Sequence, residues 1–140
     1  MNWLFDFRGR ATRLDYWRMQ LLGAVMGGAA LALSSFAIMA IGRIGGLLML
    51  ILAPVLVASL AMAVRRLHDR SKSGWWLLIF SGAPFTSAAL LTELPQLQYH
   101  WSAWPLAIVA WGVWIWGGVE IGLLAGVKGA NRYGADRLPR

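Results

Sequence analysis

The stretch RRLHDRSKSGWW, residues 65–76, interrupts an otherwise apolar chain near its middle. Four Lys or Arg residues, an aspartate and a histidine follow a run with almost no polar side chains, and Trp75 and Trp76 close the stretch. The chain is therefore divided into two apolar halves that meet at a charged connection.

Apolar runs of membrane-spanning length lie on both sides of this connection. The 140 residues are 59% hydrophobic, with a mean hydropathy of +0.58. Residues 19–41, 44–64, 75–92 and 103–127 form runs close to the ~20 residues that a helix needs to cross the hydrocarbon core. Helices of a soluble bundle need polar outer faces, which these runs lack. The sequence predicts an all-α, polytopic integral membrane protein, with four transmembrane helices in an antiparallel bundle that forms a single membrane domain over residues 1–140.

The positive charges of the chain are placed asymmetrically. The formal net charge is +7, and with four spans 12 of the 13 Lys and Arg residues fall on one side, leaving Arg43 on the other. Because positive charge accumulates in cytoplasmic loops, this side is predicted to be cytoplasmic. The prediction is a bacterial inner membrane protein with both termini, a loop at residues 65–74 and a tail at residues 128–140 in the cytoplasm. The charge alone would also suit nucleic acid, but no recognisable nucleic-acid-binding module is present.

The first eighteen residues are typical of a short interfacial segment that leads into a helix. Aromatic and apolar side chains alternate with arginines there, as expected for a segment in the headgroup layer. Thr12 and Asp15 have the spacing of a capping box, which predicts a helix start near Arg13.

The last apolar run contains a glycine stripe and a carboxylate. Gly118, Gly122 and Gly126 recur every four residues and are expected to let another helix approach closely. Glu120 is predicted to point away from this stripe, at a depth where a charged carboxylate is costly. Three outcomes fit: Glu120 is protonated, it meets an arginine such as Arg65 or Arg66, or both helix faces are buried in a bundle or oligomer.

Three polar stretches carry a family resemblance. FRGRATRLDYW near the start, RRLHDRSKSGWW in the middle and GANRYGAD near the end together resemble the bacterial inner-membrane family known as domain of unknown function 805 (DUF805), the YhaH-like proteins. The resemblance covers nearly the whole chain and implies a small multi-span inner-membrane protein. It implies no reaction.

All three stretches are predicted to lie on the cytoplasmic side, where their polar residues can converge. The candidate residues for a structural network at this rim, or for a lipid or phosphate site, are Arg10, Arg13, Asp15, Arg65, Arg66, His68, Asp69, Lys72, Ser73, Asn131 and Arg132. The first interpretation needs only ion pairs and loop hydrogen bonds that lock the inner segments together. The second relies on guanidinium groups, which suit phosphate oxygens.

Catalysis and transport are two further hypotheses for the polar residues. His68 and Asp69 can serve acid–base chemistry, but adjacent helical positions diverge by about 100°. The two histidines are predicted on opposite sides of the membrane, and the chain has no cysteine, so no metal site and no cofactor are expected. Glu120 is the candidate for an ion path in an oligomeric transporter or channel.

The favoured hypothesis is a non-enzymatic accessory or scaffold protein. Its basic cytoplasmic rim would contact anionic phospholipid headgroups or a partner, either a second copy of the chain or another membrane protein.

Overall fold

The computed structural model describes residues 4–93, 101 and 103–136, and every described element is helical apart from an isolated bridge between Asn131 and Gly134. The helices form two hairpins. α1 (Arg13–Ile41) turns back through the 3-10 helix η1 (Gly42–Leu52) into α2 (Ala53–Asp69). α3 (Trp76–Glu93) lies beside α5 (Ala103–Gly118), which ends in the single π-helical turn η2 (Val119–Leu123).

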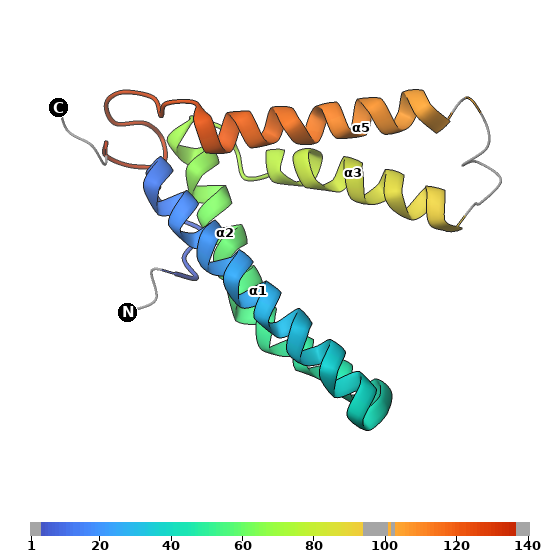
Figure 1. Cartoon of the computed structure of the whole chain (residues 1–140). Coiled ribbons are helices and arrows are strands. Elements are labelled where there is room, and N and C mark those ends of the chain that lie inside the picture. Colours follow the sequence, from blue (N-terminus) through green and yellow to red (C-terminus); the bar gives the residue numbers. More distant parts are fainter. Residues whose placement is uncertain (1–3, 94–100, 102, 137–140) are drawn as a thin grey trace.

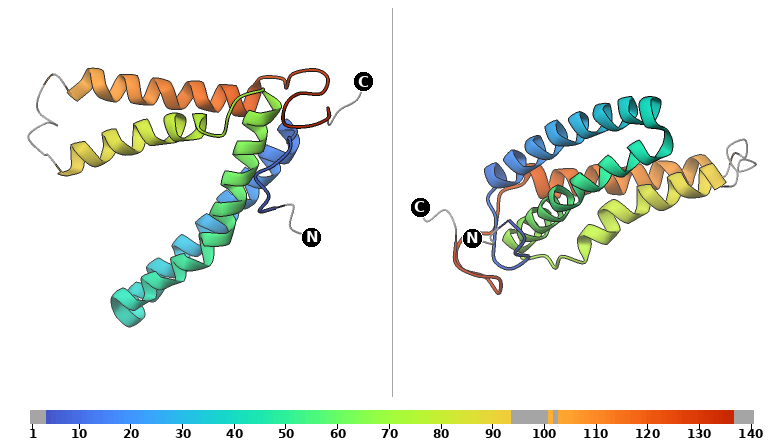
Figure 2. Two further views of the ribbon diagram at one scale, coloured as in Figure 1. Left: turned by 180° about the vertical axis from the view of Figure 1, so that it is seen from behind. Right: turned by 90° about the horizontal axis from the view of Figure 1, so that it is seen from below.

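The two hairpins meet at one end and diverge toward the other (Figure 1). The view from behind shows the same arrangement, with the described N-terminal segment and the described tail near the meeting point (Figure 2). Contacts between the hairpins join α2 to α3 and join both α1 and α2 to η2. We call the meeting point the polar junction, because the charged residues described below lie there. Antiparallel neighbours are found within each hairpin, whereas the predicted bundle of four helices is not confirmed.

The start of α1 follows from its capping residues. Thr12 is the N-cap, its hydroxyl accepts a hydrogen bond from the Asp15 amide, and the Asp15 carboxylate accepts one from the Thr12 amide. The capping box predicted from the sequence is confirmed. Two donors that a helix start leaves without partners are satisfied in this way.

The connection between the hairpins is shorter than the sequence indicated. Residues 65–69, expected in the loop, form the last turn of α2, and the loop proper is residues 70–75. α2 ends in a Schellman motif: Lys72 donates its amide to the Leu67 carbonyl and Ser71 donates to His68, with Ser71 at a φ of 58°. The turn reverses the chain and keeps residues 65–72 at the polar junction.

The bounds of two other elements also differ from expectation. The run at residues 44–64 was expected to form one helix, but its first part belongs to η1 and α2 begins at Ala53. Pro54 therefore lies in the first turn of α2, where a missing N–H leaves no hydrogen bond unmade. The last helix was expected to reach residue 127 but ends at Leu123. The external connection expected at residues 93–102 lies largely outside the described residues.

Two described helical stretches are long and apolar enough to cross a membrane. They are Arg13–Asp69, which contains the whole first hairpin, and Trp104–Leu123; Trp76–Leu90 is a shorter apolar helix. Only 22% and 28% of the most apolar windows of the two long stretches are buried within the protein. The core helix of a soluble protein would be mostly buried, so these helices are compatible with transmembrane spans.

Candidate functional site

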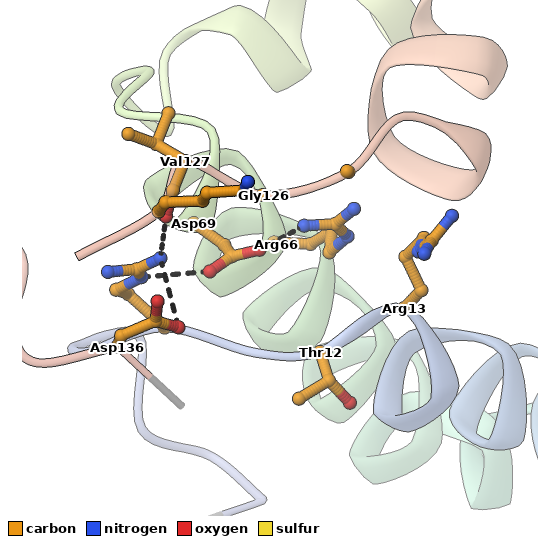
Figure 3. A pocket seen from close by; sticks show the side chains of 10 residues that line it. Thr12, Arg13, Arg66, Asp69, Gly126, Val127 and Asp136 are labelled. Atoms are coloured by element: carbon orange, nitrogen blue, oxygen red, sulfur yellow. Dashed lines mark hydrogen bonds and ion pairs between the residues drawn. The ribbon is translucent and has the colours of Figure 1, made fainter. Parts of the chain in front are cut away.

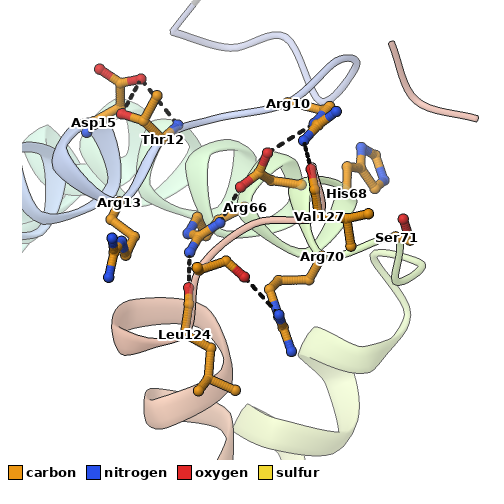
Figure 4. A network of polar contacts seen from close by, with 12 residues as sticks. Arg10, Thr12, Arg13, Asp15, Arg66, His68, Arg70, Ser71, Leu124 and Val127 are labelled. Atoms are coloured by element: carbon orange, nitrogen blue, oxygen red, sulfur yellow. Dashed lines mark hydrogen bonds and ion pairs between the residues drawn. The ribbon is translucent and has the colours of Figure 1, made fainter. Parts of the chain in front are cut away.

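The polar junction is centred on the carboxylate of Asp69, at the end of α2. Arg10 donates from Nε to Oδ1 at 2.8 Å, and Arg66 donates from Nη1 to Oδ2. All three residues are buried, with Arg66 at 0% exposure, so the two guanidinium groups share one carboxylate away from water. The network ties the N-terminal segment to α2 (Figure 4).

The segment after η2 is held by its backbone carbonyls. We call residues 124–129 the strap. Arg66 donates to the Leu124 carbonyl, and Arg70 donates to the Ala125 carbonyl at 2.6 Å. Arg10 donates to the carbonyls of Val127 at 2.6 Å and Gly129 at 2.5 Å. Just before the strap, Arg13 donates to Leu123 at 3.0 Å and the Trp17 indole to Gly122 at 3.0 Å.

These contacts explain why the last helix stops early. A helix end leaves four carbonyls without intrahelical partners and carries partial negative charge. Trp17 and Arg13 satisfy the carbonyls of Gly122 and Leu123 at this end, and Arg66 satisfies that of the next residue, Leu124, so the backbone can leave the helix. The amide of Val127 then donates to the Asp69 carbonyl at 2.9 Å, which fixes the strap against α2.

The expected glycine stripe is corrected by this geometry. Gly126 lies in the strap, outside any helix, and a Cβ there would overlap the Asp69 carboxylate. Gly122 lies in η2 against the Trp17 ring, where a Cβ would be 2.9 Å from Cζ2. A Cβ on Gly118 would meet nothing within 4 Å, whereas one on Gly117 would lie 2.6 Å from Phe80. The close approaches are made by Gly117, Gly122 and Gly126, to three different partners.

Glu120 has cationic partners, but not the expected ones. Its Oε1 accepts a hydrogen bond from Arg70 Nε at 3.0 Å and lies 3.4 Å from Lys72 Nζ. Lys72 Nζ also lies 4.7 Å from the Trp76 ring centroid. Of the three outcomes considered for this carboxylate, the meeting with an arginine is the one seen. The arginine comes from the loop after α2, because α5 ends at this level and brings Glu120 to the junction.

A third cluster holds the tail. Asn131 donates from Nδ2 to the His68 carbonyl at 2.9 Å and to Ser71 Oγ at 3.2 Å, and Arg132 donates to the Ser71 carbonyl at 3.4 Å. The Tyr133 ring stacks on His68 with centroids 3.8 Å apart, while His68 Nδ1 lies 3.1 Å from the Gly9 carbonyl. The three family-type stretches thus meet through specific contacts.

The remaining candidate residues make backbone or capping contacts. Arg65 is buried, and its carbonyl accepts a hydrogen bond from the Ala11 amide at 3.2 Å. Ser73 accepts at Oγ from the Trp75 amide at 3.4 Å, beside the start of α3. Asp15 serves the capping box.

Two groups at the junction have perturbed pKa values. Burial lowers the pKa of Arg66; the Asp69 charge opposes this, and the charges of Arg13 and Arg70 add to it. Burial also lowers the pKa of His68, against the hydrogen bond to Gly9 and with a contribution from Arg132. For both groups burial is the largest cause of the lowered pKa.

Several residues of the junction were missed from the sequence. Arg70, Trp17 and Gly117 were not among the candidates, although Arg70 and Trp17 lie inside the quoted stretches. Asp136 accepts from the Gly129 amide at 2.9 Å and lies 3.8 Å from Arg10. An arginine that caps a distant carbonyl has no local signature, so only the charge imbalance of the stretch indicated its importance.

Comparison with known proteins assigns the family. The sequence matches the family described as "Protein of unknown function (DUF805)" over residues 4–135. The chain belongs to this family. The match covers the three polar stretches up to Ala135 and therefore includes the polar junction of this DUF805 protein except Asp136.

Two relatives of the chain are proteins of Escherichia coli, and one of them is named as an inner membrane protein. The chain is 39% identical over 75 residues to "Inner membrane protein YhaI" of Escherichia coli (strain K12), a match that covers 53% of this chain and 60% of YhaI. It is 29% identical over 151 residues to "Uncharacterized protein YiiR" of the same strain, which covers 96% of this chain and 88% of YiiR. The match to YhaI thus falls short of two thirds of that protein. No solved structure matches the chain.

Proposed function

We propose that this DUF805 protein is a non-enzymatic accessory or scaffold protein of the bacterial inner membrane, with four spans and both termini in the cytoplasm. Its basic rim contacts anionic lipid headgroups. The observation that carries the proposal is the buried Arg10–Asp69–Arg66 network. Together with the arginine donations to the strap carbonyls, it joins three distant segments of the chain at one end. This arrangement suits a protein whose task is to hold two membrane hairpins in a set relation.

The surfaces of the hairpins support this placement. Large apolar side chains on the outer parts of the helices are exposed, with Phe36 at 75%, Met39 at 88% and Trp104 at 67%. Such surfaces are expected to face acyl chains, because exposure of this extent to water would be unfavourable. The exposed cations Arg8, Arg18 and Lys128 belong to the same end as the polar junction by sequence, while Arg43 is at the opposite tip. This distribution follows the positive-inside rule.

A non-enzymatic role is supported by the state of the carboxylates. Asp69, Glu120 and Asp136 each lie within 4 Å of an arginine and are held by the fold. The transporter alternative rested on Glu120 as a solitary intramembrane carboxylate, and its contacts with Arg70 and Lys72 give it a structural role instead. The scaffold proposal requires no free carboxylate for catalysis or ion transport.

Cysteine labelling tests the topology. The sequence has no cysteine, so single substitutions can be introduced without prior removals. A membrane-impermeant maleimide added to spheroplasts is expected to label Arg43→Cys but not Ser73→Cys or Lys128→Cys, which react only after lysis. Labelling of Ser73→Cys in intact spheroplasts would overturn the proposed orientation.

Lipid dependence tests the role of the rim. In nanodiscs, phosphatidylglycerol is expected to raise the Tm relative to phosphatidylcholine, because each cation near an anionic surface contributes about 1 kcal/mol. A triple variant of Arg8, Arg18 and Lys128 to Gln should lose most of this increase. Arg43→Gln, which removes a cation at the opposite tip, should keep most of it. An equal Tm in both lipids would contradict lipid contact by the rim.

A further inference from the structure

A cleft opens between the two hairpins next to the polar junction. Its volume is about 400 Å³, and it is lined by residues of α1, α2, α3, α5 and η2. The walls are mainly apolar, with Leu60, Phe80 and Trp114 as large contributors, and Gln20 and Ser59 add polar groups. We call it the inter-hairpin cleft. It lies between helices whose outer surfaces face acyl chains under the proposed function.

A smaller pocket lies within the polar junction itself (Figure 3). Its volume is about 60 Å³, enough for several waters or one tetrahedral oxyanion. The charged groups that line it are Arg10, Arg13, Arg66, Lys128, Asp69 and Asp136. Four cations against two carboxylates leave an excess of two positive charges. We call it the inner pocket.

Two arginines of the inner pocket retain donors that the described residues leave unused. Arg66 is fully buried, and its Nε has no hydrogen-bond partner. Arg13 is exposed, and the described residues show one hydrogen bond from it, to the Leu123 carbonyl. A buried donor without a partner is costly, so an oxyanion in this pocket would relieve both the unpaired donor and the excess charge.

The pocket and the cleft follow one another along the same helices. Arg13 of the pocket and Tyr16 of the cleft are three residues apart on α1, as are Arg66 and Ala63 on α2. Residues at this spacing share a helix face, about 4.5 Å apart along the axis. A positively charged pocket is therefore placed about one helical turn from an apolar cleft. A phospholipid presents the same order, with an anionic phosphate followed by acyl chains.

From this juxtaposition we propose that the protein binds one anionic phospholipid, with its phosphate at the inner pocket beside Arg13 and Arg66 and an acyl chain in the inter-hairpin cleft. The inference rests on the proposed function, which places the polar junction at the cytoplasmic headgroup layer. It goes beyond that function by assigning one stoichiometric lipid to a defined site. The phosphate chemistry alone would also suit free phosphate, which has no group to occupy the cleft.

Native mass spectrometry of protein released from nanodiscs of equal parts phosphatidylglycerol and phosphatidylcholine tests the site. The parent is expected to retain one phosphatidylglycerol. Arg13→Gln removes a phosphate donor and Gly118→Leu fills the cleft from a position where a Cβ meets nothing within 4 Å. Each should lower the retained fraction at least tenfold. The matched control Arg43→Gln removes an exposed arginine at the opposite tip, outside the rim and the pocket, and should retain the lipid.

The outcomes distinguish a lipid phosphate from free phosphate, and a stability criterion excludes variants that do not fold. Each variant must show the parent Tm within a few degrees in phosphatidylcholine nanodiscs; Lys128→Gln replaces Arg13→Gln if the latter does not. Retention by Gly118→Leu, or complete displacement of the lipid by inorganic phosphate, would overturn the proposal in favour of a free-phosphate site. Equal loss in Arg43→Gln would overturn it in favour of unspecific adsorption. In either case the rim can still show its general preference for anionic lipid, so failure of this site is distinguishable from failure of the proposed function.

Discussion

The inner and outer ends of the hairpins are held by different interactions. At the inner end, Arg10 and Arg66 are 3% and 0% exposed and donate to a carboxylate and to backbone carbonyls. Toward the outer ends, apolar side chains such as Met39 on α1 and Trp104 on α5 are exposed and the hairpins diverge. Polar contacts between distant segments therefore position the hairpins, whereas the apolar helices mainly provide a surface for lipid.

The largest effect is expected at Asp69, the carboxylate shared by two buried arginines. Asp69→Asn leaves their charges without this counterion and should destabilise the protein by about 3–5 kcal/mol, the range for one removed partner of a buried pair. Thermal or denaturant unfolding in nanodiscs measures the change. Asp6→Asn is the control, because Asp6 is exposed, and should change stability by less than about 0.5 kcal/mol. Equal stability of the two variants would show that the inner end does not depend on this network.

A substitution in the strap tests whether close backbone approach matters at the inner end. Gly126→Ala places a methyl group where the Asp69 carboxylate lies, so the strap must move away from α2. We expect a loss of about 1–3 kcal/mol, as for other overpacked sites. Gly118→Ala is the matched control, since its Cβ meets nothing within 4 Å. A comparison of unfolding free energies in which both variants behave alike would contradict the role of the strap.

The Glu120 pairs should contribute less, because their cations are partly exposed. Arg70 and Lys72 are 24% and 26% exposed at the side chain. Glu120→Gln is expected to cost about 1–2 kcal/mol. Arg70→Gln should cost a similar amount, and the double variant should lose less than the sum, because the two residues interact directly. Additive losses in this cycle would show that the pair is not coupled.

The smallest effect concerns His68 and pH. Burial lowers the pKa of His68 below its ordinary 6.5, so the folded state favours the neutral ring. The contribution is present above pH 6.5 and is lost as the pH falls through that value toward the lower folded pKa. The Tm of the parent should decrease as the pH is lowered from about 7.5 to 5.5. His68→Gln should flatten this dependence, while His100→Gln, at the other histidine, should keep it.

The sequence predicted the local features of the inner end better than its long-range contacts. The start of α1 followed from Thr12 and Asp15, because a capping box involves only neighbouring residues. The convergence of the three polar stretches was also predicted, since charge placement and span length determine which segments share a side. The partner of Glu120 was not, because it depends on where the last helix ends.

That helix end could not be found from local pattern. Residues up to 127 continue the apolar run, and nothing in their spacing indicates an end at Leu123. The end is stabilised by Arg13, Arg66 and Trp17, which lie 55 or more positions away in the sequence and cap carbonyls that any residue presents. The divergence of the hairpins also has no local pattern, because apolar runs of similar length fit a closed bundle equally well.

Double electron–electron resonance between the outer ends of the hairpins tests the central claim most directly. The protein without native cysteines can be spin-labelled at Arg43→Cys, on the tip of the first hairpin, and Trp104→Cys, near the outer end of α5. In nanodiscs, hairpins positioned by the polar junction should give one narrow distance distribution, well beyond the 8–10 Å between neighbouring packed helices, and Asp69→Asn should broaden it. A short distance typical of a closed bundle, or a distribution that Asp69→Asn leaves unchanged, would contradict the account.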